Sequence, residues 1–265
     1  MAPRDRGTPA VEPTTVAATP DLGLCLRALV EYDGTDFFGF QWQKDQRTVQ
    51  GELERALLAV AQEPIRVVGA GRTDAGVHAV GQVVALRTHW RHPIAALERA
   101  WRAFLPDDVS VRELQPAPEG FHPRFSARRR LYRYTIWSGA HPSPLHRRYA
   151  WVRSGRLDED QLNGATQIVL GEHDFAAFGQ PPQGENTVRC IYQATWIRCA
   201  DELRFDVEGN AFLKHMVRNL VGTLLRVGCG VAPIEWVSDV LTSRDRARCE
   251  PPAPPCGLCL MKIVY

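Results

Sequence analysis

The sequence predicts an α+β protein of two tandem ferredoxin-like (βαββαβ) halves, with antiparallel sheets and a central cleft. Its composition suits a packed globular protein, because 45% of the 265 residues are hydrophobic and 23% are charged. Apolar residues recur with the spacing of strands in some segments and with that of helices in others. The resulting order, strand–helix–strand–strand–helix–strand, occurs twice, as expected for two split βαβ units.

The first half begins with a strand at Leu24–Tyr32, whose apolar side chains occupy alternate positions. Thr48 is suited to cap a helix over Val49–Gln62, which has a continuous apolar face. Pro93 suits the first turn of a second helix, and Pro106 ends it. The apolar stripe of that helix is formed by Ile94, Leu97, Trp101 and Phe104. The alternation of apolar residues predicts three more strands, at Ile65–Val68, Val80–Thr88 and Val109–Leu114.

The second half repeats this order and begins with a strand at Leu131–Trp137. Its last helix, Phe212–Val227, has the strongest apolar face of the chain, and its polar His215, Arg218 and Asn219 are predicted to point away from the core. Each sheet would carry its helices on one face, so the cleft between the halves is the natural place for a ligand. The remaining elements are a helix at Leu162–Leu170 ended by Gly171, a hairpin of Arg189–Cys199 and Glu202–Val207, a short helix at Trp236–Leu241, and a final strand at Leu258–Val264.

The chain is predicted to divide into three parts. Residues 1–22 are expected to be a disordered N-terminal tail, because Pro, Thr and Ala dominate and large apolar side chains are scarce. Residues 23–118 and 119–265 are the N-terminal and C-terminal α+β subdomains. No uncharged apolar run reaches the roughly 18 residues of a membrane span, and no signal-peptide pattern is present. We therefore expect a cytoplasmic protein that makes no membrane contact.

Basic residues are concentrated in the middle of the chain. The whole chain has 32 Lys and Arg against 30 Asp and Glu, a net charge of +2. Between Arg87 and Arg156, however, 14 arginines face 5 acidic residues, a net charge of +9. Such a stretch is typical of a face that binds a polyanion such as nucleic acid, although a solvated loop and two exposed strands would give the same count.

A glycine-rich loop at Gly69–Ala79, between two predicted strands, is the strongest sign of chemistry. No Gly-Lys-Ser/Thr sequence of a phosphate-binding loop is present, and a strand follows the loop instead of the helix of a dinucleotide-binding fold. No cluster of His, Cys and acidic residues accompanies it, so no metal site is expected. The loop offers one carboxylate, Asp74, beside Arg72. A carboxylate can act as nucleophile or base, and an arginine can bind phosphate; bracing of the turn is the structural alternative.

Motifs along nearly the whole folded chain resemble the tRNA pseudouridine synthase A family. The most specific is Gly71–His78, which contains the Arg-Thr-Asp-Ala-Gly-Val-His string. Further motifs occur in the family's order: Glu31–Gly34 and Phe38–Gln41, Phe121–Ala127 with Tyr132–Tyr134, His173–Phe175 with Phe178, Asn210–Leu213 leading into His215–Asn219, and Pro254–Pro255 with Gly257–Leu258.

The resemblance implies a pseudouridine synthase fold and an isomerase that converts uridine to pseudouridine in tRNA. It further implies action at positions 38, 39 and 40 of the anticodon stem-loop, no cofactor or metal, and a homodimer. Asp74 would be the catalytic nucleophile or base, and Arg218, on the late helix, would orient it and stabilise its charge. Tyr132 would stack on the flipped base, and Arg72 would fill the space that the base vacates and hold phosphate. Contacts with the RNA backbone are expected from the arginines of the middle motif, namely Arg124, Arg128, Arg129 and Arg130.

Two other functions remain open on the residues alone. A non-enzymatic RNA-binding protein of two RRM-like modules would share the βαββαβ order, but it leaves the Asp74 loop unexplained. RRMs carry aromatic residues on their third strand, whereas Val80–Thr88 has none and Glu202–Val207 has only Phe205. A phosphate- or nucleotide-binding enzyme would use the glycine loop, but the missing lysine and helix disfavour it.

Overall fold

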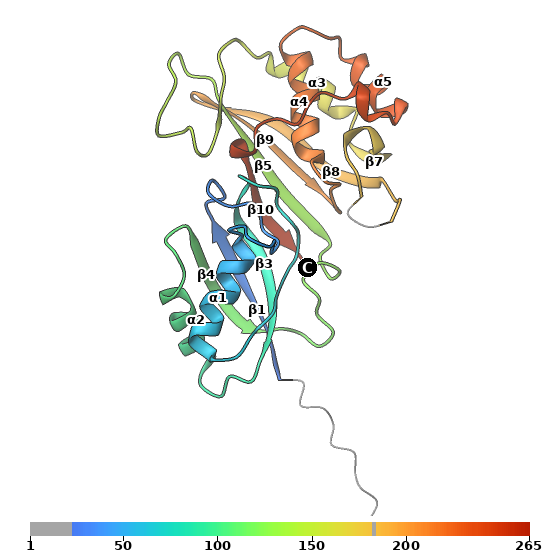
Figure 1. The fold of residues 1–265 in the computed structure, drawn as a ribbon. Coiled ribbons are helices and arrows are strands. Elements are labelled where there is room, and N and C mark those ends of the chain that lie inside the picture. Colours follow the sequence, from blue (N-terminus) through green and yellow to red (C-terminus); the bar gives the residue numbers. More distant parts are fainter. Residues whose placement is uncertain (1–22, 182–183) are drawn as a thin grey trace, which may run out of the picture.

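The computed structural model describes residues 23–181 and 184–265, and the tail predicted at residues 1–22 lies outside them. Within the described part the α+β class is confirmed (Figure 1). No helix in this part is long and apolar enough to cross a membrane. The subdomain boundary at residues 118 and 119 stays a prediction.

The first half has the predicted order of elements. Thr48 caps the first helix as expected, because its hydroxyl accepts a hydrogen bond from the Gly51 amide at 3.2 Å. The prediction that Phe104 joins the buried stripe is wrong, because the second helix ends at Ala103 and the Phe104 side chain is 51% exposed. The elements are β1 (Leu24–Tyr32), α1 (Val49–Ala61), β2 (Val67–Gly69), β3 (His78–Thr88), α2 (Ile94–Ala103) and β4 (Val109–Pro116).

The second half has the predicted elements and two additional short strands, β6 and β7. The helix predicted to run to Leu170 ends at Gln167, and Gly171 begins β7 instead of ending the helix. The helices of the second half lie against the upper part of the sheet in Figure 1, whereas α1 and α2 lie against the lower part. The elements are β5 (Arg129–Trp137), β6 (Trp151–Val152), α3 (Glu159–Gln167), β7 (Gly171–Asp174), β8 (Val188–Cys199), β9 (Glu202–Gly209), α4 (Met216–Gly228), α5 (Glu235–Ser243) and β10 (Leu258–Val264).

The late helix, α4, begins at Met216 and not at the predicted Phe212. The amide of Lys214 donates a hydrogen bond to the Gln180 carbonyl at 2.9 Å, so this stretch forms a β-bridge and cannot be helical. His215 then adopts a left-handed conformation, with φ at 64°, and the helix starts after it. Asn219 does not point away from the core as predicted. It is fully buried and donates a hydrogen bond to the Phe178 carbonyl at 2.6 Å.

The two predicted sheets are joined into one ten-stranded sheet by β10. This strand pairs in parallel with β3 of the first half and antiparallel with β5 of the second. The main path of the sheet is β4-β1-β3-β10-β5-β9-β8-β7, and β10 runs between the two halves in Figure 1. The last strand of the chain therefore sets how the halves meet.

One row of side chains indicates that both halves bury the same face of this sheet. Tyr32 is paired with Ala79, Ala79 with Leu260, and Leu260 with Tyr132. Paired residues of neighbouring strands project to the same face, so the four side chains lie in one row, and all are buried. Because helices cover this face in each half, the space above β10 is bounded by helices and loops on both sides.

Replacing Gly81 by alanine is expected to lower the free energy of unfolding by about 1–3 kcal/mol. An added Cβ would lie 2.1 Å from the Met261 carbonyl oxygen in β10, so the strands that join the halves would have to separate. Urea denaturation measures the change. Gly71→Ala is the control, because a Cβ there meets no atom within 4 Å. An equal loss in both variants would contradict this account of the junction.

Candidate active site

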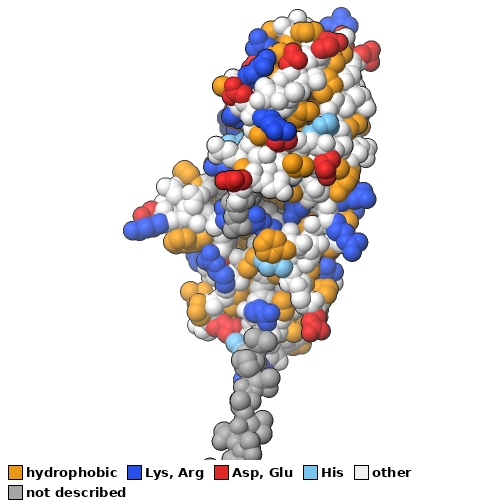
Figure 2. All heavy atoms as spheres, turned by 90° about the vertical axis from the view of Figure 1, so that its right-hand side faces the viewer, with side chains coloured by type: hydrophobic (Ala, Val, Ile, Leu, Met, Phe, Trp, Pro, Cys, Tyr) orange, Lys and Arg blue, Asp and Glu red, His pale blue; other side chains and the backbone are white. Residues whose placement is uncertain are grey.

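A cleft of about 1070 Å³ lies between the halves, on the face that the helices cover. Within residues 23–181 and 184–265, six Lys and Arg side chains line it, against one carboxylate, that of Asp74. Basic side chains gather around the middle of the face that Figure 2 shows. A cleft with this charge suits a polyanion. The six cations are Arg66, Arg72, Arg124, Arg130, Arg189 and Lys214.

Hydrogen bonds from polar side chains of the sheet hold the glycine-rich loop in place. The Gln82 amide nitrogen donates a hydrogen bond to the Gly71 carbonyl at 2.8 Å, and the hydroxyls of Tyr32 and Thr73 are hydrogen-bonded at 2.8 Å. The loop preceding α1 packs against it so closely that a Cβ on Gly39 would lie 2.7 Å from the Thr73 carbonyl oxygen. Asp74 therefore projects into the cleft from a backbone with several fixed contacts, which is a favourable setting for a reacting group.

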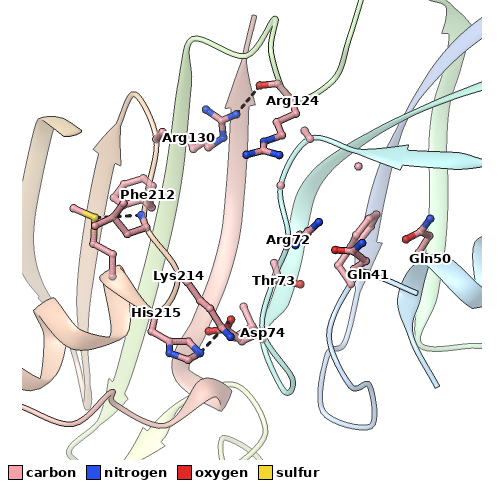
Figure 3. Close-up of a pocket in the computed structure, with 18 of the residues that line it drawn as sticks. Gln41, Gln50, Arg72, Thr73, Asp74, Arg124, Arg130, Phe212, Lys214 and His215 are labelled. Atoms are coloured by element: carbon pink, nitrogen blue, oxygen red, sulfur yellow. Dashed lines mark hydrogen bonds and ion pairs between the residues drawn. The ribbon is translucent and has the colours of Figure 1, made fainter. Parts of the chain in front are cut away.

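Asp74 is paired with Arg218, as predicted from the resemblance. Arg218 Nη1 lies 3.1 Å from Asp74 Oδ2, and the two side chains are 12% and 25% exposed. Arg218 Nε donates a second hydrogen bond, to the Ala253 carbonyl at 2.7 Å, which fixes the guanidinium. The pair joins the loop of the first half to α4 of the second. One carboxylate oxygen is thereby held while the other faces His215 and the cleft (Figure 3).

His215 is a second neighbour of the carboxylate. Its Nε2 lies 3.6 Å from Asp74 Oδ1, as the dashed line in Figure 3 marks. Burial lowers the pKa of His215 from its ordinary value of 6.5; Asp74 opposes this shift, and the nearby cations Arg218, Lys214 and Arg246 add to it. The ring therefore favours its neutral form at neutral pH, which leaves Oδ1 free of a full ion pair.

Tyr132 lies in the cleft on β5, as predicted. Its side chain is 8% exposed, and its ring contacts Phe212 edge-on at 5.2 Å between centroids. Burial raises the pKa of Tyr132 to about 12, so the hydroxyl stays protonated at neutral pH and can donate a hydrogen bond. Tyr134, two residues further on, is fully buried and donates to the Pro254 carbonyl at 2.8 Å. It belongs to the core.

The predicted arginines divide into two groups. Arg72, Arg124 and Arg130 line the cleft and appear in Figure 3. Arg72 is exposed, and within residues 23–181 and 184–265 it has no hydrogen bond or ion pair. Arg130 donates to the carbonyls of Asn210 at 2.6 Å and of Arg124 at 2.9 Å, so it also supports the loop that carries Arg124.

The structure does not bring Arg128 and Arg129 to the cleft. Arg129 precedes Arg130 on β5 and points to the opposite face of the sheet, because side chains alternate along a strand. There it pairs with Glu208 at 3.0 Å. Arg128 is exposed before the strand begins and is not among the residues that line the cleft. Their expected contact with RNA stays a prediction.

Several cleft residues were not predicted from the sequence. The cations Arg66, Arg189 and Lys214 lie outside the basic span, and no local pattern distinguishes them. Exposed aromatic side chains also line the cleft: Phe38, Trp42 and Phe125. The motifs that contain Phe38 and Phe125 could have indicated them, but nothing in the sequence shows that these motifs share one cleft. No group of three His, Cys, Asp or Glu side chains suited to a metal occurs in the described part of the chain.

The pKa of His215 offers a direct check of this geometry. We expect an NMR titration of its ring to have a midpoint below 6.5, lower still in Asp74→Asn, and higher in Arg218→Ala, because the two neighbours act with opposite sign. A pKa lowered by folding means that protonation opposes folding, so this residue reduces stability as the pH falls below about 6.5. Shifts of equal sign in both variants would contradict the arrangement.

Comparison with known proteins establishes the family. The profile described as tRNA pseudouridine synthase matches residues 28–126 and 165–265, which include Asp74 and Arg218. The chain belongs to this family. Family members named tRNA pseudouridine synthase A are similar over most of their length. The protein from Roseiflexus sp. (strain RS-1) is 46% identical, covering 89% of this chain and 88% of its own. The Pseudothermotoga lettingae protein is 42% identical, covering 90% and 98%.

The family profile spans both halves, so the alternative of two separate RRM-like modules is not supported. A solved structure of an archaeal box H/ACA sRNP complex matches 84% of this chain and 59% of its own, with a TM-score of 0.35 and 14% identity. At that level the likeness carries no argument about the site.

Proposed function

We propose that this chain isomerises uridine to pseudouridine in tRNA and that Asp74 is the residue that reacts with the target nucleotide. The observation that carries the proposal is the position of Asp74. Among the described residues that line the cationic cleft it is the one carboxylate, and it is held by Arg218 from the opposite half. Family membership supplies the reaction, and the charge of the cleft suits an RNA substrate.

The reaction needs no oxidant, reductant or co-substrate. The bond between C1′ and N1 of uridine breaks, a bond between C1′ and C5 forms, the hydrogen on C5 leaves as a proton, and N1 gains a proton. Asp74 serves as nucleophile or base in this exchange, with Oδ1 on the side of the cleft that Arg218 leaves free. A paired uridine must first leave its stack, which costs a few kcal/mol.

Other cleft residues have matching roles. Tyr132, with a protonated hydroxyl, packs against the flipped base and donates a hydrogen bond to it. Arg72, which is exposed beside Asp74, binds phosphate or fills the space that the base leaves. Arg124 and Arg130 contact the RNA backbone. The target positions 38, 39 and 40 in the anticodon stem-loop, the homodimer, the cytoplasmic location and independence from cofactors are further parts of this proposal.

Tritium release from tRNA labelled with [5-³H]uridine tests the function, because isomerisation frees the hydrogen on C5 and the assay contains no methyl donor that would allow C5 methylation. The purified protein is expected to release tritium without any added cofactor. Release should stop when cytidine replaces uridine at positions 38, 39 and 40 together. No release from any labelled tRNA would refute the enzyme, and continued release from the substituted tRNA would refute the positions alone.

The affinity for tRNA is expected to fall steeply as salt rises. If all six cations of the cleft contact phosphate, the slope of log K against log salt approaches about −5 in duplex regions. Fluorescence anisotropy at several potassium chloride concentrations measures it. Replacing Arg189 by alanine should reduce the slope by about 1, whereas replacing Arg55, which pairs with Glu52 outside the cleft, should not. A flat salt dependence would contradict the cationic cleft as the RNA site.

A further inference from the structure

The exposed aromatic side chain of Phe125 is left without a role by the reaction chemistry. It is 72% exposed, although it lines the cleft, and it lies in the segment that connects the two halves. A large apolar ring in water is unfavourable, and a single one on a surface needs no explanation. Here the ring stands beside cations in a cleft for RNA, and aromatic rings beside cations are the usual platform for unpaired bases.

The turn that carries Phe125 is fixed and not a loose loop. His122 and Ser126 close it with two hydrogen bonds, from the Ser126 amide to the His122 carbonyl at 2.9 Å and from the His122 amide to Ser126 Oγ at 3.1 Å. The ring nitrogen Nδ1 of His122 accepts hydrogen bonds from the amides of Arg124 and Phe125, at 3.1 and 3.3 Å. Tyr265 also anchors the turn, through its hydroxyl on the Pro123 carbonyl at 2.9 Å. The backbone of the turn is thus ordered before RNA binds, so little backbone entropy is lost on binding.

The neighbours of the ring also suit stacking. The imidazole of His122 lies 4.4 Å from it between centroids, tilted by 34°, and the Arg124 guanidinium lies 5.4 Å from its centre. The imidazole and the guanidinium therefore contact the Phe125 ring while most of the ring surface stays exposed. In Figure 3, Arg124 lies at the opposite end of the close-up from Asp74. A base on Phe125 is therefore a different base from the one that reacts.

We propose that Phe125 is a stacking subsite for an unpaired RNA base other than the target uridine. The inference rests on the proposed function, since it assigns a second contact of the same RNA. A base within a duplex exposes its edges and not its faces, so only an unpaired or terminal base can stack in this way. The subsite thereby favours substrates in which the target uridine lies near an unpaired segment.

Steady-state tritium release from tRNA by Phe125 variants tests this subsite. We expect Phe125→Ala to lower kcat/KM by about 10- to 100-fold, mainly through KM, since a stacked base contributes that much binding. Phe125→Trp should keep near-native activity. Phe125→Leu should lose nearly as much as the alanine variant, because an apolar group without a flat ring cannot stack. Phe104→Ala is the matched control: that phenylalanine is 51% exposed, lies outside the cleft, and should have no effect.

An abasic scan of the unpaired nucleotides in the tRNA substrate locates the base. Removing the base that stacks on Phe125 should weaken binding to the native protein as much as Phe125→Ala weakens binding of the intact RNA. The abasic RNA and Phe125→Ala together should show no further loss of affinity. Binding is measured by anisotropy, so the test holds even if no tritium is released, and a failure of the proposed function stays distinguishable. Full activity of the alanine or leucine variant, or independent losses at every abasic position, would overturn the subsite. A change in oligomeric mass of Phe125→Ala would overturn it in favour of a protein interface.

Discussion

Replacing Asp74 by asparagine is expected to reduce tritium release from labelled tRNA by at least about 10³-fold, because the amide can neither attack carbon nor accept a proton. The amide is almost the same size and still accepts the hydrogen bond that Arg218 donates at 3.1 Å. The fold of the loop should therefore persist. Tritium release under single-turnover conditions measures the chemical step apart from product release.

Binding separates a chemical role of Asp74 from a structural one. The affinity of Asp74→Asn for tRNA should stay within a few-fold of native, or rise, because a negative charge has left a cationic cleft. Asp36→Asn is the matched control, since this exposed carboxylate lies outside the cleft beside Arg148. Comparable release by the Asp74 and Asp36 variants would remove Asp74 from the mechanism, and a large loss of affinity in Asp74→Asn would assign it to binding.

Replacing Arg218 by alanine is expected to lower kcat by about 10²-fold or more, with a smaller effect on KM. The substitution removes the group that holds Asp74 Oδ2 and leaves the carboxylate able to turn toward His215 at 3.6 Å. Misplacement of a reacting group by about 1 Å is enough for a loss of this size. Arg218→Lys should restore only part of the rate, since an ammonium cannot hold Asp74 and the Ala253 carbonyl in the same fork geometry.

Arg226→Ala is the matched control for this experiment. Arg226 lies on the same helix, α4, but its partner is Glu250, and the two side chains are 44% and 29% exposed. Loss of such a pair changes stability by less than about 1 kcal/mol and should leave turnover unchanged. Thermal unfolding of both variants shows whether the folds are intact. Native turnover by Arg218→Ala would mean that Asp74 is oriented by its own loop.

The sequence predicted most elements because their patterns are local. The strand at Leu24–Tyr32 and the cap at Thr48 follow from alternation and from one hydroxyl, and both are confirmed. The predicted start of α4 was wrong because the helix is limited by Gln180, a residue that is distant in sequence and pairs with Lys214. The predicted burial of Phe104 was wrong because the helix ends before this residue, so the period of the apolar stripe no longer determines its exposure.

The basic span was a poor guide to the basic cleft. Counted along the chain it has a large positive charge, but many of its arginines are paired in the folded protein. Arg102 pairs with Glu98, Arg112 with Glu31, and Arg133 with Asp206. Cations from distant segments, such as Arg189 and Lys214, line the cleft instead, whereas Arg66 also lines it but pairs with Glu54. Charge adds up in space and not along the sequence, so only the fold shows which charges remain available.

By itself the sequence determined the α+β class, the order of the elements and the loop that carries Asp74, because periodicity, caps and glycine-rich turns act between residues a few positions apart. No local pattern indicated that Arg218, 144 residues further on, meets this carboxylate: the family resemblance implied it, and the tertiary structure decided it. That meeting depends on β10, which returns from the end of the chain to lie between β3 and β5. Pairing between distant strands depends on the packing of the whole sheet, and no local pattern of residues specifies it.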